Sequence, residues 1–449
     1  MIMKYEEKQP APDAFENMMD SDFGMADHQP KNRIASVSIG GSIFSTPSVS
    51  KDLIVFGCND TFVYALDRCG EKQWSLKTGD MAFSSPTFFR ESVIIGSNDG
   101  FVYNIDKSGE LRWKANLGTK VYGTPTVIDD VIYVGSENGI FRAMSLEDGK
   151  EIWRINTGDE IWFSSAAVNG SIFIGNHSGL FNCISKDGEV LWKFHAGNCT
   201  VSSPLVVDKI GNEVSSFRNR SFQSFPRADG CRVIFGAGDG YTRCFDAGSG
   251  QLLWKVFTNW IGGSASFYDN KRFFLGSYDG RVYSIDMSGA VKWKFQTGNK
   301  IVSSPFVSNG IVFAGSSDSN VYALDAGSGD MIWRFLTDGE IISSPVADGG
   351  VVYFASWDGH LYALSIKDKS VMWKFATSVS YPSFITRPHT VDVKVPAQRP
   401  VEFTPTATLK GYQIEGTINQ FGERTSTFYG ARGPAYKSGS SYKTRKDRY

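Results

Sequence analysis

Eight tryptophans recur along this chain at an almost constant interval. The intervals between consecutive members are 39, 40, 39, 62, 39, 40 and 40 residues. A period of about 40 residues is typical of propeller blades and other repeat architectures, in which similar units pack against one another and share a core. The recurring residues are Trp74, Trp113, Trp153, Trp192, Trp254, Trp293, Trp333 and Trp373. This interval constrains the fold more strongly than any local motif does.

One repeat contains four short segments with the residue pattern of β-strands. In the repeat that includes Trp333, β-branched and aromatic residues alternate with turns rich in Gly, Ser and Asn. The expected strands are Ile301–Val307, Ile311–Gly315, Val321–Asp325 and Met331–Leu336. Four antiparallel strands in about 40 residues make one propeller blade. The sequence therefore predicts an all-β fold, an eight-bladed propeller of four-stranded antiparallel blades.

The other recurring residues have structural explanations. A glycine stands four residues before the tryptophan in seven repeats, and Lys369 stands there in the eighth. Glycine permits the positive φ of a hairpin turn, and the tryptophan offers a large flat surface to the neighbouring blade. Function is therefore expected in the residues that differ between repeats.

The pattern resembles the pyrroloquinoline-quinone-type propeller repeat. The residues that carry the resemblance are Ala323-Leu324-Asp325, the turn Gly329 and Trp333, with their counterparts over residues 34–385. Known members include quinone-dependent alcohol dehydrogenases and a non-enzymatic lipoprotein of outer-membrane β-barrel assembly. The sequence has neither the adjacent cysteines of the dehydrogenases nor a matching Glu/Asn/Asp calcium set. It also has no lipidation cysteine near its start. The resemblance implies the fold and neither function, and it argues against a quinone-dependent dehydrogenase.

The cysteine count, the net charge and the first residues bound the protein class. The six cysteines and five histidines lack metal-ligand spacing, so we expect reduced, mostly buried thiols, no metal site and no cofactor. The net charge of −1 argues against nucleic acid as a partner of the whole chain. The sequence shows no secretory signal and no run of transmembrane length, so the expected location is the cytoplasm.

The chain divides into a repeat domain and two extensions. Residues 1–33 form a polar, acidic leader that is expected to be disordered, or alternatively to act as a short binding peptide with apolar anchors. Residues 34–385 form the propeller. Residues 386–449 form a basic tail that is expected to be mostly disordered, with an acidic partner, RNA or a membrane surface as alternative contacts. The anchors of the leader are Phe15, Met18, Met19, Phe23 and Met25.

An insertion at residues 209–231 lengthens the fifth repeat. It falls between the first and second strands, on the face opposite the loops that join consecutive blades. One interpretation is a tolerated surface insertion, and the other is a partner-binding loop, because arginine and aromatic residues are enriched at interface hot spots. Nucleic-acid binding is the weakest alternative because the basic run is short. The candidate partner-binding residues are Phe217, Arg218, Arg220, Phe222, Phe225 and Arg227.

The entrance to the central channel is the second candidate site. Its lining positions differ between repeats, with aromatic residues in the first four and smaller or aliphatic residues, Gly263 among them, in the others. Opposite charges stand on neighbouring repeats, with Ile261 at the equivalent position of the sixth. The alternative is that the rings pack between blades and the charges pair without a function. The candidate residues are Phe44, Phe83, Lys120, Tyr122, Glu160, Trp162, Lys300 and Glu340.

Two function classes follow from these features. The leading prediction is a non-enzymatic scaffold that holds protein partners through one propeller face, the inserted loop and the tail. The alternative is an enzyme or small-molecule-binding protein with its site at the channel mouth, lined by Phe83, Tyr122 and Trp162 beside Lys120 and Glu160. We find no nucleophile elbow, phosphate loop or catalytic triad signature, which leaves the enzyme question open and favours no activity.

Overall fold

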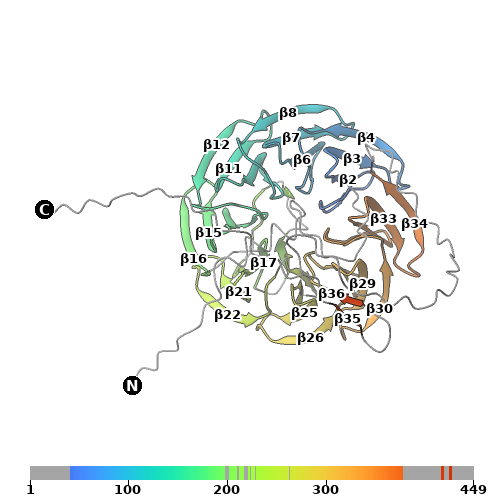
Figure 1. Cartoon of the computed structure of the whole chain (residues 1–449). Coiled ribbons are helices and arrows are strands. Elements are labelled where there is room, and N and C mark those ends of the chain that lie inside the picture. The colour runs from blue at the N-terminus through green and yellow to red at the C-terminus, as the bar shows by residue number, and fades with distance from the viewer. Residues whose placement is uncertain are drawn as a thin grey trace, which may run out of the picture. The chain divides into compact units, whose positions relative to one another are not determined.

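The eight-bladed propeller predicted from the tryptophan period is confirmed. A computed structural model of the chain describes residues 41–377, apart from 198–201, 210–211, 217–220, 223, 228, 262 and 270, and the strands at 416–418 and 424–426. Eight antiparallel sheets follow one another around a ring, and the described residues contain no helix (Figure 1). The predicted leader and the segment before Gly41 lie outside the described residues.

The four antiparallel strands of each blade come from one stretch of chain, which the insertion lengthens in blade 5. The first strands lie nearest the channel and the fourth strands lie at the rim (Figure 1). The first strands are β1 (Ser48–Val49), β5 (Thr87–Phe89), β9 (Thr126–Ile128), β13 (Ala166–Val168), β17 (Leu205–Val207), β23 (Ser266–Tyr268), β27 (Phe306–Ser308) and β31 (Val346–Asp348). The second strands are β2 (Ile54–Gly57), β6 (Ser92–Gly96), β10 (Val131–Gly135), β14 (Ser171–Gly175), β20 (Arg232–Gly236), β24 (Arg272–Gly276), β28 (Ile311–Gly315) and β32 (Val351–Ala355).

The outer half of each blade pairs over more residues than the first strand does. The third strands are β3 (Phe62–Leu66), β7 (Phe101–Asp106), β11 (Ile140–Ser145), β15 (Leu180–Ser185), β21 (Tyr241–Asp246), β25 (Arg281–Asp286), β29 (Asn320–Asp325) and β33 (His360–Ser365). The fourth strands are β4 (Lys72–Lys77), β8 (Leu111–Asn116), β12 (Glu151–Asn156), β16 (Val190–His195), β22 (Leu252–Phe257), β26 (Val291–Gln296), β30 (Met331–Leu336) and β34 (Val371–Ala376).

One predicted strand was placed too early. The first strand of the seventh blade was expected at Ile301–Val307 and lies at Phe306–Ser308. The residues before Pro305 instead form the loop that enters from the sixth blade. Their polar groups bond to the next blade, as in the 2.9 Å bond from Ser304 N to the Ser344 hydroxyl. Alternation in the sequence does not distinguish a strand from a loop whose hydrogen bonds go to a neighbouring sheet.

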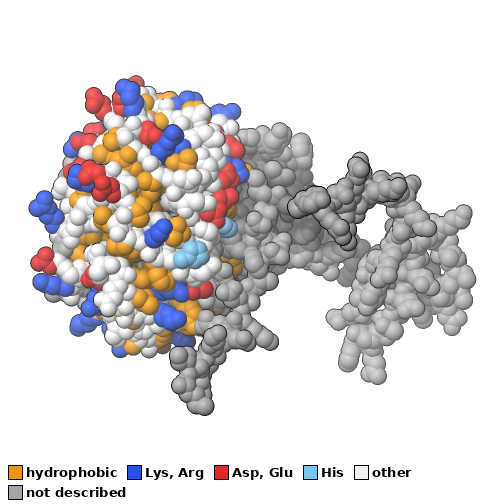
Figure 2. All heavy atoms as spheres, turned by 90° about the vertical axis from the view of Figure 1, so that its left-hand side faces the viewer, with side chains coloured by type: hydrophobic (Ala, Val, Ile, Leu, Met, Phe, Trp, Pro, Cys, Tyr) orange, Lys and Arg blue, Asp and Glu red, His pale blue; other side chains and the backbone are white. Residues whose placement is uncertain are grey.

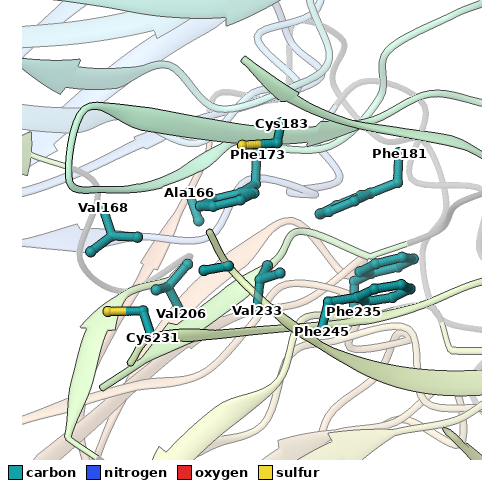
Figure 3. Packing of buried hydrophobic residues seen from close by; sticks show 11 residues of the cluster. Ala166, Val168, Phe173, Phe181, Cys183, Val206, Cys231, Val233, Phe235 and Phe245 are labelled. Carbon is teal, nitrogen blue, oxygen red and sulfur yellow. The ribbon is translucent and has the colours of Figure 1, made fainter. Parts of the chain in front are cut away.

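The hydrophobic core is divided into layers between adjacent blades. The described buried residues form eight clusters, one for each junction. At the junction of blades 4 and 5, Phe181 stacks on Phe235 with ring centroids 3.9 Å apart, and Phe173 and Cys183 lie on the same side of the layer as Phe181 (Figure 3). Burial of both faces of every sheet explains why the inner strands read as continuous apolar runs.

The repeated tryptophans link each blade to the next. In all eight blades the indole N–H donates to a backbone carbonyl in the turn before the fourth strand of the next blade, at 2.8–3.1 Å. Trp373 of the last blade donates to Arg68 of the first. The Thr377 hydroxyl donates to the Gly41 carbonyl at 2.9 Å, which brings the two ends of the propeller together. The eight tryptophans thus contribute one hydrogen bond to each junction between blades.

The rim of the propeller carries both apolar and basic side chains. Figure 2 shows the side of the ring where β12 and β16 lie, with hydrophobic side chains in a band among charged ones. Several residues in the two positions before the tryptophan are large and apolar, and about half exposed, such as Ile152, Leu191 and Leu253. A lysine or arginine directly follows the tryptophan in seven blades. Charged residues on an edge strand oppose pairing with another chain.

The chain divides into two units, Met1–Ser383 and Phe384–Tyr449. Within the second unit the structure describes one antiparallel pair, β35 (Gly416–Ile418) and β36 (Arg424–Ser426). This pair lies in the predicted basic tail, whose other residues lie outside the described part of the chain.

Candidate functional site

A ring of hydroxyl groups, one from each blade, surrounds the channel. The backbone N–H of Thr46 donates to the Ser85 hydroxyl at 2.9 Å, and that of Ser344 donates to the Thr46 hydroxyl at 3.2 Å. These bonds join consecutive blades and fix the loops that enter each blade. The eight residues of the ring, Thr46, Ser85, Thr124, Ser164, Ser203, Ser264, Ser304 and Ser344, all line one cavity of ≈ 150 Å³.

An arc of aromatic side chains lies two residues before the hydroxyls in blades 1 to 4. Phe44 stacks on Phe83 with centroids 4.8 Å apart, and Phe83 meets Tyr122 edge to face at 5.7 Å. Tyr122 stacks on Trp162 at 4.7 Å. All four rings are about half buried and line the same cavity as the hydroxyl ring. The structure thus brings together the four aromatic residues that the sequence indicated, and we call them the aromatic arc.

Two further rings extend the aromatic arc at its ends. Trp357 of blade 8 lies 4.9 Å from Phe44, and His177 stacks on Trp162 at 5.7 Å. Both residues stand in the turn between the second and third strands of their blades. The sequence reasoning missed them because it compared the loops that enter the blades and omitted this turn. Aligning that turn across the repeats would have found them.

Lys120, the charged candidate of blade 3, forms an ion pair within its own blade. Lys120 Nζ lies 3.4 Å from the Glu137 carboxylate, which also accepts bonds from the hydroxyls of Tyr122, at 3.3 Å, and Thr119, at 2.8 Å. The hydrogen bond with Tyr122 raises the pKa of Lys120 and keeps its ammonium group charged. This cluster holds the Tyr122 ring in place beside the cavity.

Glu160 of blade 4 is held by the aromatic arc itself. Its carboxylate accepts a hydrogen bond from Trp162 Nε1 at 2.5 Å. Burial raises the pKa of Glu160, and burial also lowers the pKa of His177. Burial therefore favours the neutral forms of both side chains, and each of them contacts the Trp162 indole.

The other charged candidates, Lys300 and Glu340, stand in blades 7 and 8. Lys300 Nζ lies 5.7 Å from the centre of the Tyr278 ring, a cation–π contact. The backbone carbonyl of Glu340 accepts a bond from Trp357 N at 2.9 Å. None of the four charged candidates is among the residues that line the mouth cavity.

The sequence alignment was shifted by one residue in blade 6. It placed Ile261 at the position of Lys300, but the bond from Tyr278 N to the carbonyl of Trp260 gives that position to Trp260. Ile261 is instead fully buried in the core. Trp260 stacks on Tyr278 with centroids 4.9 Å apart, so blade 6 also presents aromatic rings at the mouth.

The inserted segment of blade 5 reaches across blade 4. It forms β18 (Glu213–Ser215), which pairs with β17, and β19 (Ser221–Phe222), which runs parallel to β9 of blade 3. Phe222 and Phe225 pack against the core cluster between blades 3 and 4. Ser221 lines a second cavity of ≈ 210 Å³ together with the first strands of blades 1 and 2.

The candidate residues of the insertion therefore have different surroundings. Phe222 and Phe225 contact the propeller, whereas Arg227 is exposed. Phe217, Arg218 and Arg220 lie outside the described residues. The partner-binding role of this loop stays a prediction.

The cysteines of the described residues are mostly buried. Cys58, Cys183 and Cys244 are buried free thiols, Cys231 is also buried, and Cys69 is exposed. Burial raises the pKa of Cys183 and Cys244 to about 12, which keeps both thiols protonated. In the described part of the chain no group of three acidic, histidine or cysteine side chains is arranged to hold a metal ion. None of these residues forms a helix of the length and apolarity needed to cross a bilayer.

The chain matches one protein-family model and is similar in fold to several solved structures. A family model described as outer membrane protein assembly factor BamB matches residues 59–163, 238–374 and 310–394, more than half of the chain. No curated protein matches. The crystal structure of BamB from Moraxella catarrhalis is 17% identical, with a TM-score of 0.59, and the match covers 71% of this chain and 93% of that one.

Two further solved structures are similar in fold. The computationally designed Ika8 protein is 16% identical with a TM-score of 0.61, over 72% of this chain and 96% of its own. Sqt1 from Saccharomyces cerevisiae is 14% identical with a TM-score of 0.60, over 73% of this chain and 96% of its own. At these identities the likeness concerns the propeller fold.

Proposed function

The chain belongs to the family described as outer membrane protein assembly factor BamB, and on that premise we propose that it is a non-enzymatic scaffold that binds partner proteins at its channel mouth. The observation that carries the proposal is the aromatic arc, which runs without interruption across blades 1 to 4. Interface hot spots are enriched in aromatic residues that cluster at the centre of a contact surface. The family description, which names an assembly factor, agrees with a role in holding other proteins.

The size of the cavity favours a protruding side chain over a small-molecule substrate. Sites for small molecules occupy about 300–1,000 Å³. The mouth cavity, at ≈ 150 Å³, is smaller than that range. It suits one apolar or aromatic side chain of a partner, with the hydroxyl ring below and the paired charges of Lys120 and Glu137 at its margin. We therefore expect a partner that presents an exposed apolar residue on a loop or a chain end.

The test is capture of partners by the full-length protein in its own cells, followed by native mass spectrometry. Phe83→Ala should lose a stoichiometric partner that the parent chain retains, because it removes the central ring of the aromatic arc. Phe257→Ala is the matched control, since Phe257 lies on the rim and is 59% exposed. Loss of the partner from both variants, or from neither, would refute binding at the mouth.

A deletion variant distinguishes partner binding at the channel mouth from partner binding by the tail. Removal of residues 387–449 should leave the partner bound if the mouth carries the affinity. Release of the partner by this deletion, with retention by Phe83→Ala, would instead assign binding to the tail.

A second function, binding or conversion of a small molecule, is favoured by one observation. Glu160 combines a raised pKa with a position next to His177 and Trp162, as acid–base groups in catalytic sites do. A bound small molecule in the native mass spectrum, lost in Glu160→Gln and kept in Phe257→Ala, would support this function. A spectrum with a protein partner and no small molecule would support the scaffold.

A further inference from the structure

A cavity of ≈ 400 Å³ lies in the groove between blades 2 and 3, away from the aromatic arc. Its volume falls within the range of about 300–1,000 Å³ that is typical of ligand sites. Blade 2 contributes the end of β8 and the turn at Gly118, and blade 3 contributes Arg142, Glu151 and Arg154. Nothing lies within 4 Å of the place where a Cβ at Gly118 would stand, so the backbone leaves room on that side.

Arg142 departs from a pattern that five of the other seven blades share. In five blades this position is a tyrosine whose hydroxyl donates to an aspartate four residues earlier, at 2.5–2.7 Å. In blade 3 the aspartate is replaced by Asn138 and the tyrosine by Arg142. A neutral amide cannot balance a guanidinium, so Arg142 needs a carboxylate from another place.

The strand register places a second positive charge next to Arg142. Arg142 on β11 lies directly opposite Arg154 on β12. Like charges at directly opposed positions destabilise a strand pair unless an anion lies between them. Glu151 is that anion, 3.2 Å from Arg142 Nε and 3.5 Å from Arg154 Nε.

The ion-pair network of the cavity therefore carries two positive charges and one negative charge. The other hydrogen bonds that Arg142 donates within the described residues go to neutral acceptors, namely the Ser136 hydroxyl at 2.9 Å, the Leu117 carbonyl at 3.2 Å and the Ile140 carbonyl at 3.5 Å. The side chain of Arg142 is 7% exposed and that of Arg154 is 61% exposed. The cavity thus has one fixed, buried guanidinium and one that is accessible from solvent.

Blade 5 shows the balanced version of the same arrangement. Arg243 occupies the position of Arg142, and its register partner is Lys255. There the turn retains Asp239, which accepts hydrogen bonds from both terminal nitrogens of Arg243. Arg243 thus has a carboxylate of its own, whereas Arg142 shares Glu151 with Arg154.

We propose that the groove between blades 2 and 3 binds an oxyanion, a carboxylate or a phosphate group, through Arg154 and Arg142. Guanidinium groups bind both anions through paired hydrogen bonds, and desolvation in a cavity strengthens the contact. The oxyanion supplies the second negative charge that the Arg142–Glu151–Arg154 network lacks. This site is independent of the channel mouth and of the scaffold function.

The test is titration calorimetry of the full-length chain at low salt with three probes, namely inorganic phosphate, succinate and a glutamate-rich peptide. Arg154→Gln and Asn138→Asp should each weaken binding by about tenfold or more, because the first removes a donor and the second supplies the missing carboxylate. Asn138→Asp should keep the fold, since six other blades have aspartate at this position. Lys255→Gln in blade 5 is the matched control and should leave binding unchanged.

The three probes identify the source of the oxyanion, and the variants test whether it binds at this site. Binding of phosphate or succinate indicates a free small anion, and binding of the peptide alone indicates an acidic segment of a partner. Failure of all three probes at millimolar concentration would overturn the proposal. Binding that Asn138→Asp and Arg154→Gln leave unchanged would also overturn it.

Discussion

The turn glycines show how one residue satisfies two physical demands. Gly109 has φ +96°, and a Cβ there would lie 2.6 Å from Cγ of Trp74 in the preceding blade. Gly118 has a similar φ of +85°, but its Cβ would meet nothing within 4 Å. The two positions therefore separate the cost of a left-handed backbone from the cost of a steric clash.

Gly118→Ala should lower the free energy of unfolding by about 1–2 kcal/mol, the cost of placing an L-residue in the left-handed region. Gly109→Ala should cost about 1–3 kcal/mol more, because the methyl group displaces the Trp74 ring. Denaturant unfolding of both variants measures the difference. Equal losses would show that the contact with the tryptophan does not constrain the glycine.

Glu160 gives a pH dependence with a defined sign. Its pKa in the folded protein is raised by burial above the ordinary value of 4.5, so the folded chain holds this proton more tightly than the unfolded chain. Its contribution to stability is therefore greatest below pH 4.5 and is lost as the pH rises through the native pKa. Glu160→Gln should stabilise the protein at pH 7 by under about 1 kcal/mol, since the half-exposed position is screened, and should have no effect at pH 4. Melting temperatures from pH 4 to 8 test this, and a larger gain at pH 4 would reverse the assignment.

At the scale of elements, the inserted segment acts as part of the sheet structure. β18 adds a strand to blade 5, and β19 adds one to blade 3. The Ser215 hydroxyl at the end of β18 accepts a hydrogen bond from Ala167 N of blade 4 at 3.0 Å. The backbone of Asn169 in blade 4 donates to the Pro226 carbonyl at 2.7 Å. The insertion therefore connects three consecutive blades near the channel.

Phe225→Ala should lower the free energy of unfolding by about 1–2 kcal/mol, because the half-buried ring packs against the core and meets Tyr133 edge to face at 6.2 Å. Arg227→Ala is the control and should change stability by less than about 0.5 kcal/mol, since its side chain is exposed. Thermal unfolding of the two variants measures this contrast. An unchanged Phe225→Ala variant would mean that the segment is only loosely attached.

The sequence predicted local features better than pairings between distant segments. The strands at Ile311–Gly315 and Met331–Leu336 were placed correctly, because alternation and turn residues act locally. The pairing of Phe222 with Ile128 joins different repeats and has no local signal. The sequence also did not indicate Arg142 as a site residue, because only the strand register shows that it lies opposite Arg154. The aromatic arc was found because its members stand at equivalent positions of successive repeats.

At the scale of the whole molecule, the last junction has the same bonds as the others. Trp373 donates to Arg68 as Trp113 donates to Leu146. The ion pair of Arg68 with Asp348 adds a further contact between blades 8 and 1. The ring therefore has no junction that lacks the repeated tryptophan bond.

Trp373→Phe and Trp113→Phe should each lower the free energy of unfolding by about 1–2 kcal/mol, and by the same amount within about 0.5 kcal/mol, because each loses one hydrogen bond between blades. Both variants should unfold in a single transition by calorimetry. An early separate transition in Trp373→Phe alone would show that blades 8 and 1 form the weakest junction.

The hydrogen bond between Thr377 and Gly41 bears on the order in which the blades can follow one another along the chain. Because the four strands of each blade come from one stretch of chain and the two ends of the propeller touch, the starting point of the chain is arbitrary with respect to the ring. A circularly permuted protein, with these ends joined by a short linker and new termini opened in another loop between blades, retains every contact between blades that the native order provides. Only the segment that connects blades 3, 4 and 5 restricts where such a cut can be made.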